Sequence, residues 1–283
     1  MYNTRDLVKR TERCLTCHLG TGDKSVDHEL IAAGHPDLYF ELDSFLSVMP
    51  PHWKDVDKDP LLGVRALAVG QAVQLREQLK RVARESQSGI WPEYAELDCF
   101  ACHHNLVAAK DSWRQERGYA SRRPGNPPFN LSRYVVLREV VQQADPAAAQ
   151  QLNSEVDKVS TLVTALGSDR KQVSAEAASA SEIADRVAQR LNGMTFDQPM
   201  TLRLMKGIAS DGDSIANQGE RAAEQATMAL DSLFVAYTKN TRLANEAQIR
   251  ASLNALFKQL EDPSAYNGFQ LAVALKSFSA LLP

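Results

Sequence analysis

The chain has 283 residues, of which 44% are hydrophobic and 24% charged, a balance that allows a sizeable buried core. Its net charge of −3 is unlike the strongly basic composition of proteins that bind nucleic-acid phosphates, so that class of partner is excluded. No window approaches the roughly eighteen uninterrupted apolar residues of a membrane span, and the N-terminal MYNTRDLVKRTER lacks the apolar stretch of a secretory signal. We therefore expect a globular protein without a membrane span.

Proline and glycine divide the N-terminal part into short predicted helices joined by loops. Residues 27–34 are predicted to form two helical turns that end there, because the backbone before a proline is pushed out of the α region. Pro36 suits the first position of a second helix over 36–49, in which apolar residues recur at helical spacing. A long helix is expected over about 61–85, and another helical stretch is expected to begin near Pro92.

The segment 112–130 is rich in proline, glycine and arginine and marks the predicted domain boundary. From residue 131 onward the apolar residues follow helical spacing, with breaks expected near Gly167, Asn192-Gly193, Asp211-Gly212 and Asp262-Pro263. These breaks leave five or six helices, a number that suits an antiparallel bundle. No sustained strand-like alternation occurs, so the sequence predicts an all-α protein. Residues 1–130 would form short helices with long loops, and residues 131–283 an antiparallel helical bundle.

Cysteine and histidine are confined to the first part of the chain. The four cysteines fall in two copies of Cys-x-x-Cys-His, RCLTCHLG at residues 13–20 and DCFACHHN at residues 98–105. All six histidines lie in the same part: His18, His28, His35, His52, His103 and His104. The metal-binding chemistry of the chain is therefore predicted to lie there.

Cys-x-x-Cys-His is the attachment signature of c-type haem. Two cysteines three positions apart lie on one helical face, so both thiols can add across the haem vinyl groups while the adjacent histidine ligates the iron. The predicted cofactors are two covalently bound c-type haems, which would organise the N-terminal domain. The residues that would hold them are Cys14, Cys17 and proximal His18 for the first haem, and Cys99, Cys102 and proximal His103 for the second.

Structural zinc sites and redox dithiols also use Cys-x-x-Cys. A dithiol of the thioredoxin kind accompanies a βαβ unit, and the sequence shows no such pattern. A zinc site that shared all four cysteines would bridge about 80 residues, well beyond the usual short separation of zinc ligands. The two motifs therefore favour haem, and a zinc-stapled structural protein is the alternative.

Two six-coordinate haems need two further axial ligands, and four histidines remain to supply them. His35 is the preferred distal ligand, because the glycine before it would let a flat macrocycle approach closely. His28 is the second candidate and His104 the third, while His52 could be a ligand or a loop histidine. Met49 shares a helical face with apolar residues and is expected in the core. Bis-histidine ligation lacks the potential-raising effect of a Met/His pair, so low reduction potentials are predicted.

Two further groups of side chains suit a bound haem. Aromatic residues are expected to pack on porphyrin faces, or else in an ordinary core: Tyr39, Phe40, Phe45, Trp53, Trp91, Phe100 and Trp113. A basic group after the second motif could pair with haem propionates, or else form a solvated linker: Lys110, Arg114, Arg117, Arg122 and Arg123.

Residues 10–130 resemble the multihaem cytochromes c, in particular the group around the tetrahaem electron carrier that serves hydroxylamine oxidation. The likeness rests on CLTCH, on HELIAAGHPDLYFEL with its two histidines, on MPPHW, and on CFACHH followed by SWRQERGY. Members of this group usually carry four or more haems and an N-terminal signal, so the chain is expected to be the C-terminal portion of a longer multihaem protein, or a chain whose start has been misplaced or trimmed. The resemblance implies the following ligands: proximal His18 and His103, and distal His35 with His28 or His104, to haems of this or a missing region.

The expected function is electron transfer between extracytoplasmic redox partner proteins, with further haem-bearing segments or subunits as additional partners. The resemblance implies a periplasmic location, because members of the family receive their haems outside the cytoplasm. The alternative is a haem enzyme in which one iron keeps an open position and acts on a small nitrogen or sulfur compound. Four spare histidines for two irons favour a carrier over a catalyst.

Overall fold

The structure is a computed structural model that describes residues 3–22, 24–50, 59–88, 90–103, 126–165, 167–239 and 241–283. Across these ranges the fold is all-α, as the sequence predicts. The described β-structure comprises one small antiparallel hairpin, β1 (Gly20–Thr21) with β2 (Lys24–Ser25), and an isolated bridge between Leu97 and Phe129.

Helices make up most of the described chain. Up to residue 103 they are α1 (Leu7–His18), α2 (His28–Ala32), α3 (Leu42–Val48), α4 (Leu62–Glu85) and the 3-10 turns η1 (Tyr94–Glu96) and η2 (Cys99–Ala101). From residue 126 they are α5 (Ser132–Ala144), α6 (Pro146–Thr164), α7 (Arg170–Asn192), α8 (Gln198–Ser210), α9 (Gly212–Asn217), α10 (Glu220–Thr238), α11 (Glu246–Lys258), the 3-10 turn η4 (Pro263–Ala265) and α12 (Gly268–Leu281).

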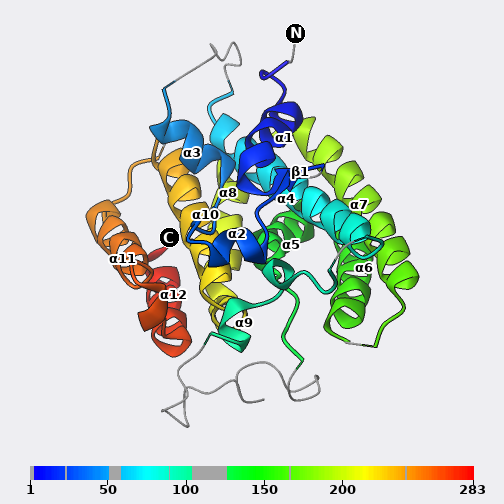
Figure 1. Cartoon of the computed structure of the whole chain (residues 1–283). Coiled ribbons are helices and arrows are strands. Elements are labelled where there is room, and N and C mark those ends of the chain that lie inside the picture. The colour runs from blue at the N-terminus through cyan, green and yellow to red at the C-terminus, as the bar shows by residue number, and fades with distance from the viewer. Residues whose placement is uncertain are drawn as a thin grey trace.

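The long helix α4 lies at the centre of the fold (Figure 1). From Val64 to Val82 its side chains are buried around most of its circumference, which is typical of a helix that packs on all sides. It packs against α7 and α5 and also against α1 and α3. A Cβ added at Gly70 would lie 2.8 Å from the Cβ of Leu42, so glycine lets the start of α3 rest directly on α4.

A second central helix, α10, packs against α5, α8, α4 and α11. One hydrophobic core runs through the described residues from Leu7 to Leu282. The helix α4, which falls in the predicted domain 1–130, therefore shares its core with α5, α7 and α10 of the predicted bundle. The division of the chain at residue 130 stays a prediction.

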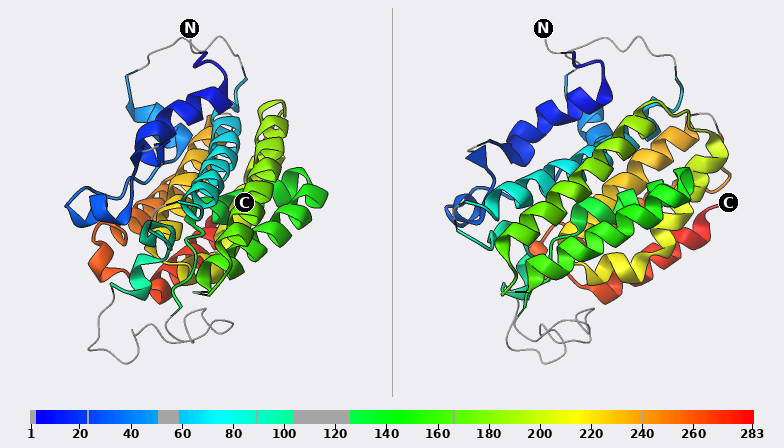
Figure 2. Two further views of the ribbon diagram at one scale, coloured as in Figure 1. Left: turned by 45° about the vertical axis from the view of Figure 1, so that its right-hand side comes forward. Right: turned by 90° about the vertical axis from the view of Figure 1, so that its right-hand side faces the viewer.

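The first three helices lie along one flank of the bundle (Figure 2). Arg76 of α4, whose side chain is 3% exposed, fixes α1 to this flank. Its guanidinium donates to Glu12 of α1 at 2.6 Å and to Asp185 of α7 at 2.5 Å. The helix that carries the first motif is thus joined through one buried arginine to two long helices of the bundle.

Helix ends in the C-terminal part fall near the predicted breaks. The helix α6 ends at Thr164, α7 at Asn192, α8 at Ser210, and α11 at Lys258 shortly before Pro263. The described part of 131–283 nevertheless holds eight α-helices rather than five or six. Two of the additional breaks have clear causes, because Asp145 caps α6 just before Pro146, and Gly219 has a φ of 93° before α10.

The helix predicted over 36–49 is much shorter than expected. Only Leu42–Val48 is helical, and Glu41 begins it by accepting the backbone N–H groups of Asp43 and Ser44. The preceding residues 35–40 run without helical structure and are tied to α10: Asp37 pairs with Arg221, and the hydroxyl of Tyr39 donates to Glu220 at 2.5 Å. These tertiary contacts override the local helical pattern.

The helical stretch predicted to begin near Pro92 is also replaced, by the short turns η1 and η2. The intervening Leu97 pairs with Phe129, and the N–H of Asp98 donates to the carbonyl of Pro128 at 2.9 Å. This pairing with a remote segment prevents the backbone of residues 94–101 from continuing as an α-helix.

None of the helices within the described residues is both long enough and apolar enough to cross a lipid bilayer. This finding agrees with the expectation of no membrane span for the described part of the chain.

Candidate functional site

The first Cys-x-x-Cys-His motif occupies the last turn of α1. Asp6 caps the start of this helix by accepting the N–H of Lys9 at 2.9 Å. Cys14 and Cys17 stand three positions apart and so share a helical face, with Cys14 half-buried and Cys17 exposed. The helix ends at His18, so the two thiols and the imidazole lie together within its last turn.

The ring of His18 lies among aromatic side chains. Its centroid is 4.8 Å from that of Phe40 and 4.9 Å from that of Phe45. Burial lowers the pKa of His18, although the nearby backbone of Tyr39 and Leu38 opposes this shift. The imidazole is therefore neutral near pH 7, the form in which histidine ligates a metal.

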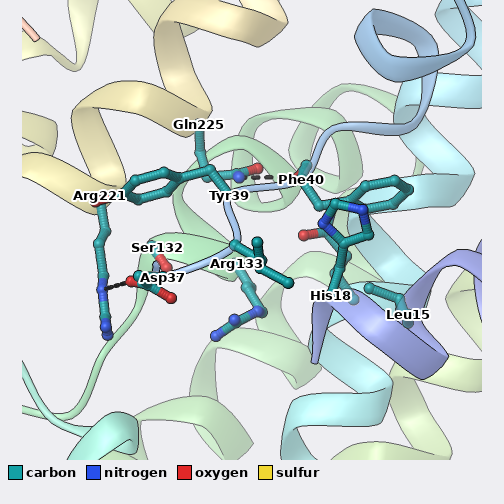
Figure 3. A pocket seen from close by; sticks show the side chains of 11 residues that line it. Leu15, His18, Asp37, Tyr39, Phe40, Ser132, Arg133, Arg221 and Gln225 are labelled. Carbon is teal, nitrogen blue, oxygen red and sulfur yellow. Dashed lines mark hydrogen bonds and ion pairs between the residues drawn. The ribbon is translucent and has the colours of Figure 1, made fainter. Parts of the chain in front are cut away.

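Phe40 is fixed against His18 by contacts with α4 and α10 (Figure 3). The side-chain amide of Gln225 donates to the carbonyl of Phe40 at 2.9 Å, and Gln71 donates to Gln225 at 3.2 Å. Both glutamines are buried, so this arrangement is shielded from water. Two of the aromatic residues singled out from the sequence, Phe40 and Phe45, thus line the first motif.

The second motif forms one tight turn around η2. The backbone N–H groups of Cys102 and His103 both donate to the carbonyl of Cys99, at 3.1 and 2.7 Å. Cys99, Cys102 and His103 are all exposed. The turn therefore presents two thiols and an imidazole together at the surface of the protein.

His28 faces His103, although the two residues are 75 positions apart in the sequence. Their ring centroids are 6.3 Å apart, with an interplanar angle of 32°. Two imidazoles on opposite sides of one metal ion, with metal–nitrogen bonds of ~2 Å, also have centroids roughly 6 Å apart. The pair therefore has the separation of two axial ligands to a single iron.

The position of His28 is set by η1. Glu93 accepts both the backbone N–H of His28 and that of Ala95, each at 2.9 Å. Tyr94 packs edge-on against the His28 ring, with centroids 5.5 Å apart. The segment just before the second motif thus holds the start of α2 directly beside that motif.

A groove of about 680 Å³ opens beside His28. Its lining combines two exposed side chains, Ile90 and Tyr94, which are 74% and 55% exposed, with the carboxylates of Asp27, Glu29, Glu85 and Glu93. A groove of this size lies within the range of small-molecule and cofactor sites.

A buried polar network connects the two motifs. Arg81 of α4 donates to the carbonyls of Leu19 and Val26 at 3.0 and 3.1 Å, directly after the first motif. The same guanidinium pairs with Glu96 of η1, just before the second motif. Glu96 also accepts from Gln78 at 2.8 Å. One arginine therefore fixes the position of the first motif relative to the second.

His35, the preferred distal ligand, is half-buried, and among the described contacts no ring contact or hydrogen bond joins it to His18 or His103. Its Nδ1 lies 2.8 Å from the carbonyl oxygen of Pro36. A carbonyl only accepts, so Nδ1 carries a proton, and in the neutral imidazole Nε2 then keeps its lone pair. This is the usual state of a metal-ligating histidine. The role of His35 stays a prediction.

Several other predicted residues fall outside the described residues, namely His52, His104, Trp53, Trp113 and the basic group of Lys110, Arg114, Arg117, Arg122 and Arg123. Met49 is 42% exposed and so is not the core residue expected from its spacing, because α3 ends at Val48.

The four cysteines, all within the described residues, form no disulfide. Among these residues, no three histidine, cysteine, aspartate or glutamate side chains gather into a group that could hold a metal ion. Burial raises the pKa of the half-buried Cys14 thiol, the opposite of the shift at a reactive dithiol. This arrangement does not fit one zinc ion bound by four cysteines. It fits two separate Cys-x-x-Cys-His sites, each with its own set of contacts.

The chain matches no family model, no curated protein and no solved structure in comparisons of its sequence and fold with known proteins.

Proposed function

We propose that the protein is a c-type cytochrome that carries electrons between extracytoplasmic redox partners. One haem would be attached at Cys14 and Cys17 with His18 as a ligand, and the other at Cys99 and Cys102. The observation that carries this proposal is the approach of His28 to His103 at 6.3 Å, which matches two axial ligands of one iron.

When bound, the haem would supply a one-electron iron couple, and the protein residues would determine how it exchanges electrons. With His28 and His103 on both sides of the iron, no position would remain for a substrate, which favours a carrier over an enzyme. The exposed Cys99 and Cys102 would place the attached edge of the macrocycle at the surface. A partner protein could then approach this edge directly.

A single stretch of chain supports both sites. It begins at His28, against the second motif, and continues to Phe40 and Phe45, against the first. Between them the ion pair of Asp37 with Arg221 lines the cavity beside His18 and also acts on the Cys99 thiol. These shared neighbours support two haems on the same flank of the bundle, an arrangement that suits transfer between them.

The motifs and their spacing suggest the class of protein. We propose that the chain is related to multihaem cytochromes c of the tetrahaem electron-carrier kind and that its haems are attached outside the cytoplasm. Redox proteins would be its partners, and further haem-bearing segments or subunits could extend the electron path.

The test is production of the chain in a host that carries out c-type haem maturation, with export supplied by an added leader. We expect a red protein that keeps two haems per chain on a denaturing gel. The double substitution Cys99→Ser and Cys102→Ser should leave one haem, as should Cys14→Ser with Cys17→Ser. A colourless product that contains zinc would contradict the proposal.

Ligand binding separates a carrier from an enzyme. We expect the reduced variant that retains the second haem alone to show no spectral change with carbon monoxide, because both axial positions are taken. Rapid binding of carbon monoxide at this haem would favour the enzyme alternative.

A further inference from the structure

A small cavity lies beside His18, where α1, residues 37–40, α4, α5 and α10 meet (Figure 3). Its volume of about 10 Å³ has room for about one oxygen atom or water molecule. His18, Gln74 and Arg133 all line it. The cavity is thus lined partly by the helix that carries the first motif and partly by helices of the bundle.

Three buried nitrogen atoms on this wall make no hydrogen bond: Nδ1 of His18, Nε2 of Gln74 and Nη1 of Arg133. Buried polar atoms without a partner are uncommon and each costs about 1–3 kcal/mol. A guanidinium has only donors, so the group that would satisfy Arg133 must be an acceptor. The donor atoms of Gln74 and Arg133 therefore call for an oxygen acceptor, and both residues line the same small space.

The charges around Arg133 define this ligand further. Arg133 lies within electrostatic range of two cations, Arg81 and Arg221, and two anions, Glu96 and Asp37. Glu96 is already paired with Arg81, and Asp37 with Arg221. Among these three arginines, Arg133 is the one without an ion pair in the described contacts.

Burial, together with the charge of Arg81, lowers the pKa of Arg133 to about 10. A guanidinium with this pKa remains protonated at neutral pH, so the protein bears the cost of a buried charge. An anion offsets this cost better than a neutral water, because its opposite charge attracts the guanidinium strongly in a site of low dielectric constant.

We propose that Arg133 binds the carboxylate of a haem propionate, whose oxygen enters this cavity beside His18. This inference rests on the proposed function and adds a residue that the sequence pattern did not indicate. The size of the cavity favours the tip of a larger group over a whole free ion, because a small oxyanion has several oxygen atoms and the space holds about one. Propionates are carboxylates, and a single carboxylate oxygen can accept a charge-assisted hydrogen bond from Nη1 of Arg133.

The first test is a crystal structure of the protein with its haems attached. We expect a propionate oxygen within hydrogen-bond distance of Arg133. A free oxyanion at Arg133, or a water molecule alone, would overturn the assignment. Absence of attached haem would instead contradict the proposed function itself, so the two failures are distinguishable.

The second test compares Arg133→Gln with Arg203→Gln, a matched control on an exposed arginine of α8. We expect Arg133→Gln to retain both haems and to shift the midpoint potential of one of them to a more negative value, because a cation that disfavours the oxidised haem is lost. Arg133→Lys, which keeps the charge, should shift it less, and it also serves if the glutamine variant does not fold. Potentials equal to those of the Arg203→Gln control would overturn the proposal.

A titration of the intact protein with acetate and phosphate identifies the source of the carboxylate. We expect the potential of the haem affected by Arg133→Gln to stay constant as either anion is added, because a covalently tethered propionate already fills the cavity. A potential that depends on acetate or phosphate, and loses this dependence in Arg133→Gln, would show a free anion site and overturn the propionate assignment.

Discussion

The ion pair between Arg81 and Glu96 should be one of the strongest single determinants of stability. Both side chains are almost fully buried, at 4% and 0% exposure. Arg81→Met would keep the apolar stem of the side chain but leave Glu96 as a buried charge with Gln78 as its remaining donor. Removal of one partner of a buried pair costs about 3–5 kcal/mol, which is a large part of the free energy of unfolding of a typical domain.

The cost has a second part, because Arg81 also satisfies the carbonyls of Leu19 and Val26. The carbonyl of Leu19 keeps a second donor, the backbone N–H of Val26 at 3.2 Å, so the lost hydrogen bond falls mainly on the carbonyl of Val26 and adds about 1 kcal/mol. A double variant, Arg81→Met with Glu96→Leu, removes the unpaired charge but does not restore this hydrogen bond. We therefore expect it to recover at least about 2 kcal/mol relative to the sum of the two single variants.

The assay is urea unfolding followed by circular dichroism at pH 7 for wild type, both single variants and the double variant, in one state of haem loading. Burial alone would raise the pKa of Glu96, but Arg81 and Arg133 outweigh it and hold this pKa below its usual range. A depressed folded-state pKa stabilises the protein above the unfolded pKa and ceases to do so as the pH falls through the folded pKa. The loss caused by Arg81→Met should thus shrink in acid. Additive single variants, or a loss that grows in acid, would refute the reasoning.

Three other predictions follow from single side chains. Burial raises the pKa of Glu41 to about 7, so the folded state favours the protonated carboxyl. The free energy of unfolding should therefore fall by about 3 kcal/mol as the pH rises from about 4.5 to 7, at ~1.4 kcal/mol per pKa unit. In urea titrations across that range, Glu41→Gln should remove this dependence on pH. Gly70→Ala should lower the melting temperature, because the new Cβ would lie 2.8 Å from that of Leu42 and overpacking costs about 1–3 kcal/mol. An unchanged melting temperature would show that α3 moves away from α4 without cost. His35→Ala should convert one haem toward high spin in absorption spectra, and an unchanged low-spin spectrum would remove His35 from the ligands.

The sequence predicted the all-α class, the long helix α4 and most breaks of the C-terminal part, because these follow from helical spacing and from local stop signals. It did not predict the extended run before α3 or the turns around Cys99. Those backbones are set by remote partners, such as Arg221 for Asp37 and Phe129 for Leu97, which local patterns do not reveal.

In the candidate site, too, local patterns predicted some residues and remote contacts determined others. Motif spacing alone identified Cys14, Cys17, Cys99 and Cys102 and their adjacent histidines. The glycine before His35 favoured it over His28 as a distal ligand, whereas the fold brings His28 to His103 through Glu93 and Tyr94.

Two arginines of the site carried no signal in the sequence. Arg81 and Arg133 look like ordinary charged residues of helices. Their burial, which gives them their roles, arises from packing between α1, α4 and α5.

The most direct test is electron paramagnetic resonance of the ferric protein that carries Cys14→Ser and Cys17→Ser and therefore retains only the second haem. The proposed ligation by His28 and His103 predicts a low-spin signal typical of two imidazole ligands, which His28→Ala in the same background should convert to a high-spin signal. A high-spin signal before that substitution, or a low-spin signal that survives it, would contradict this pair of ligands.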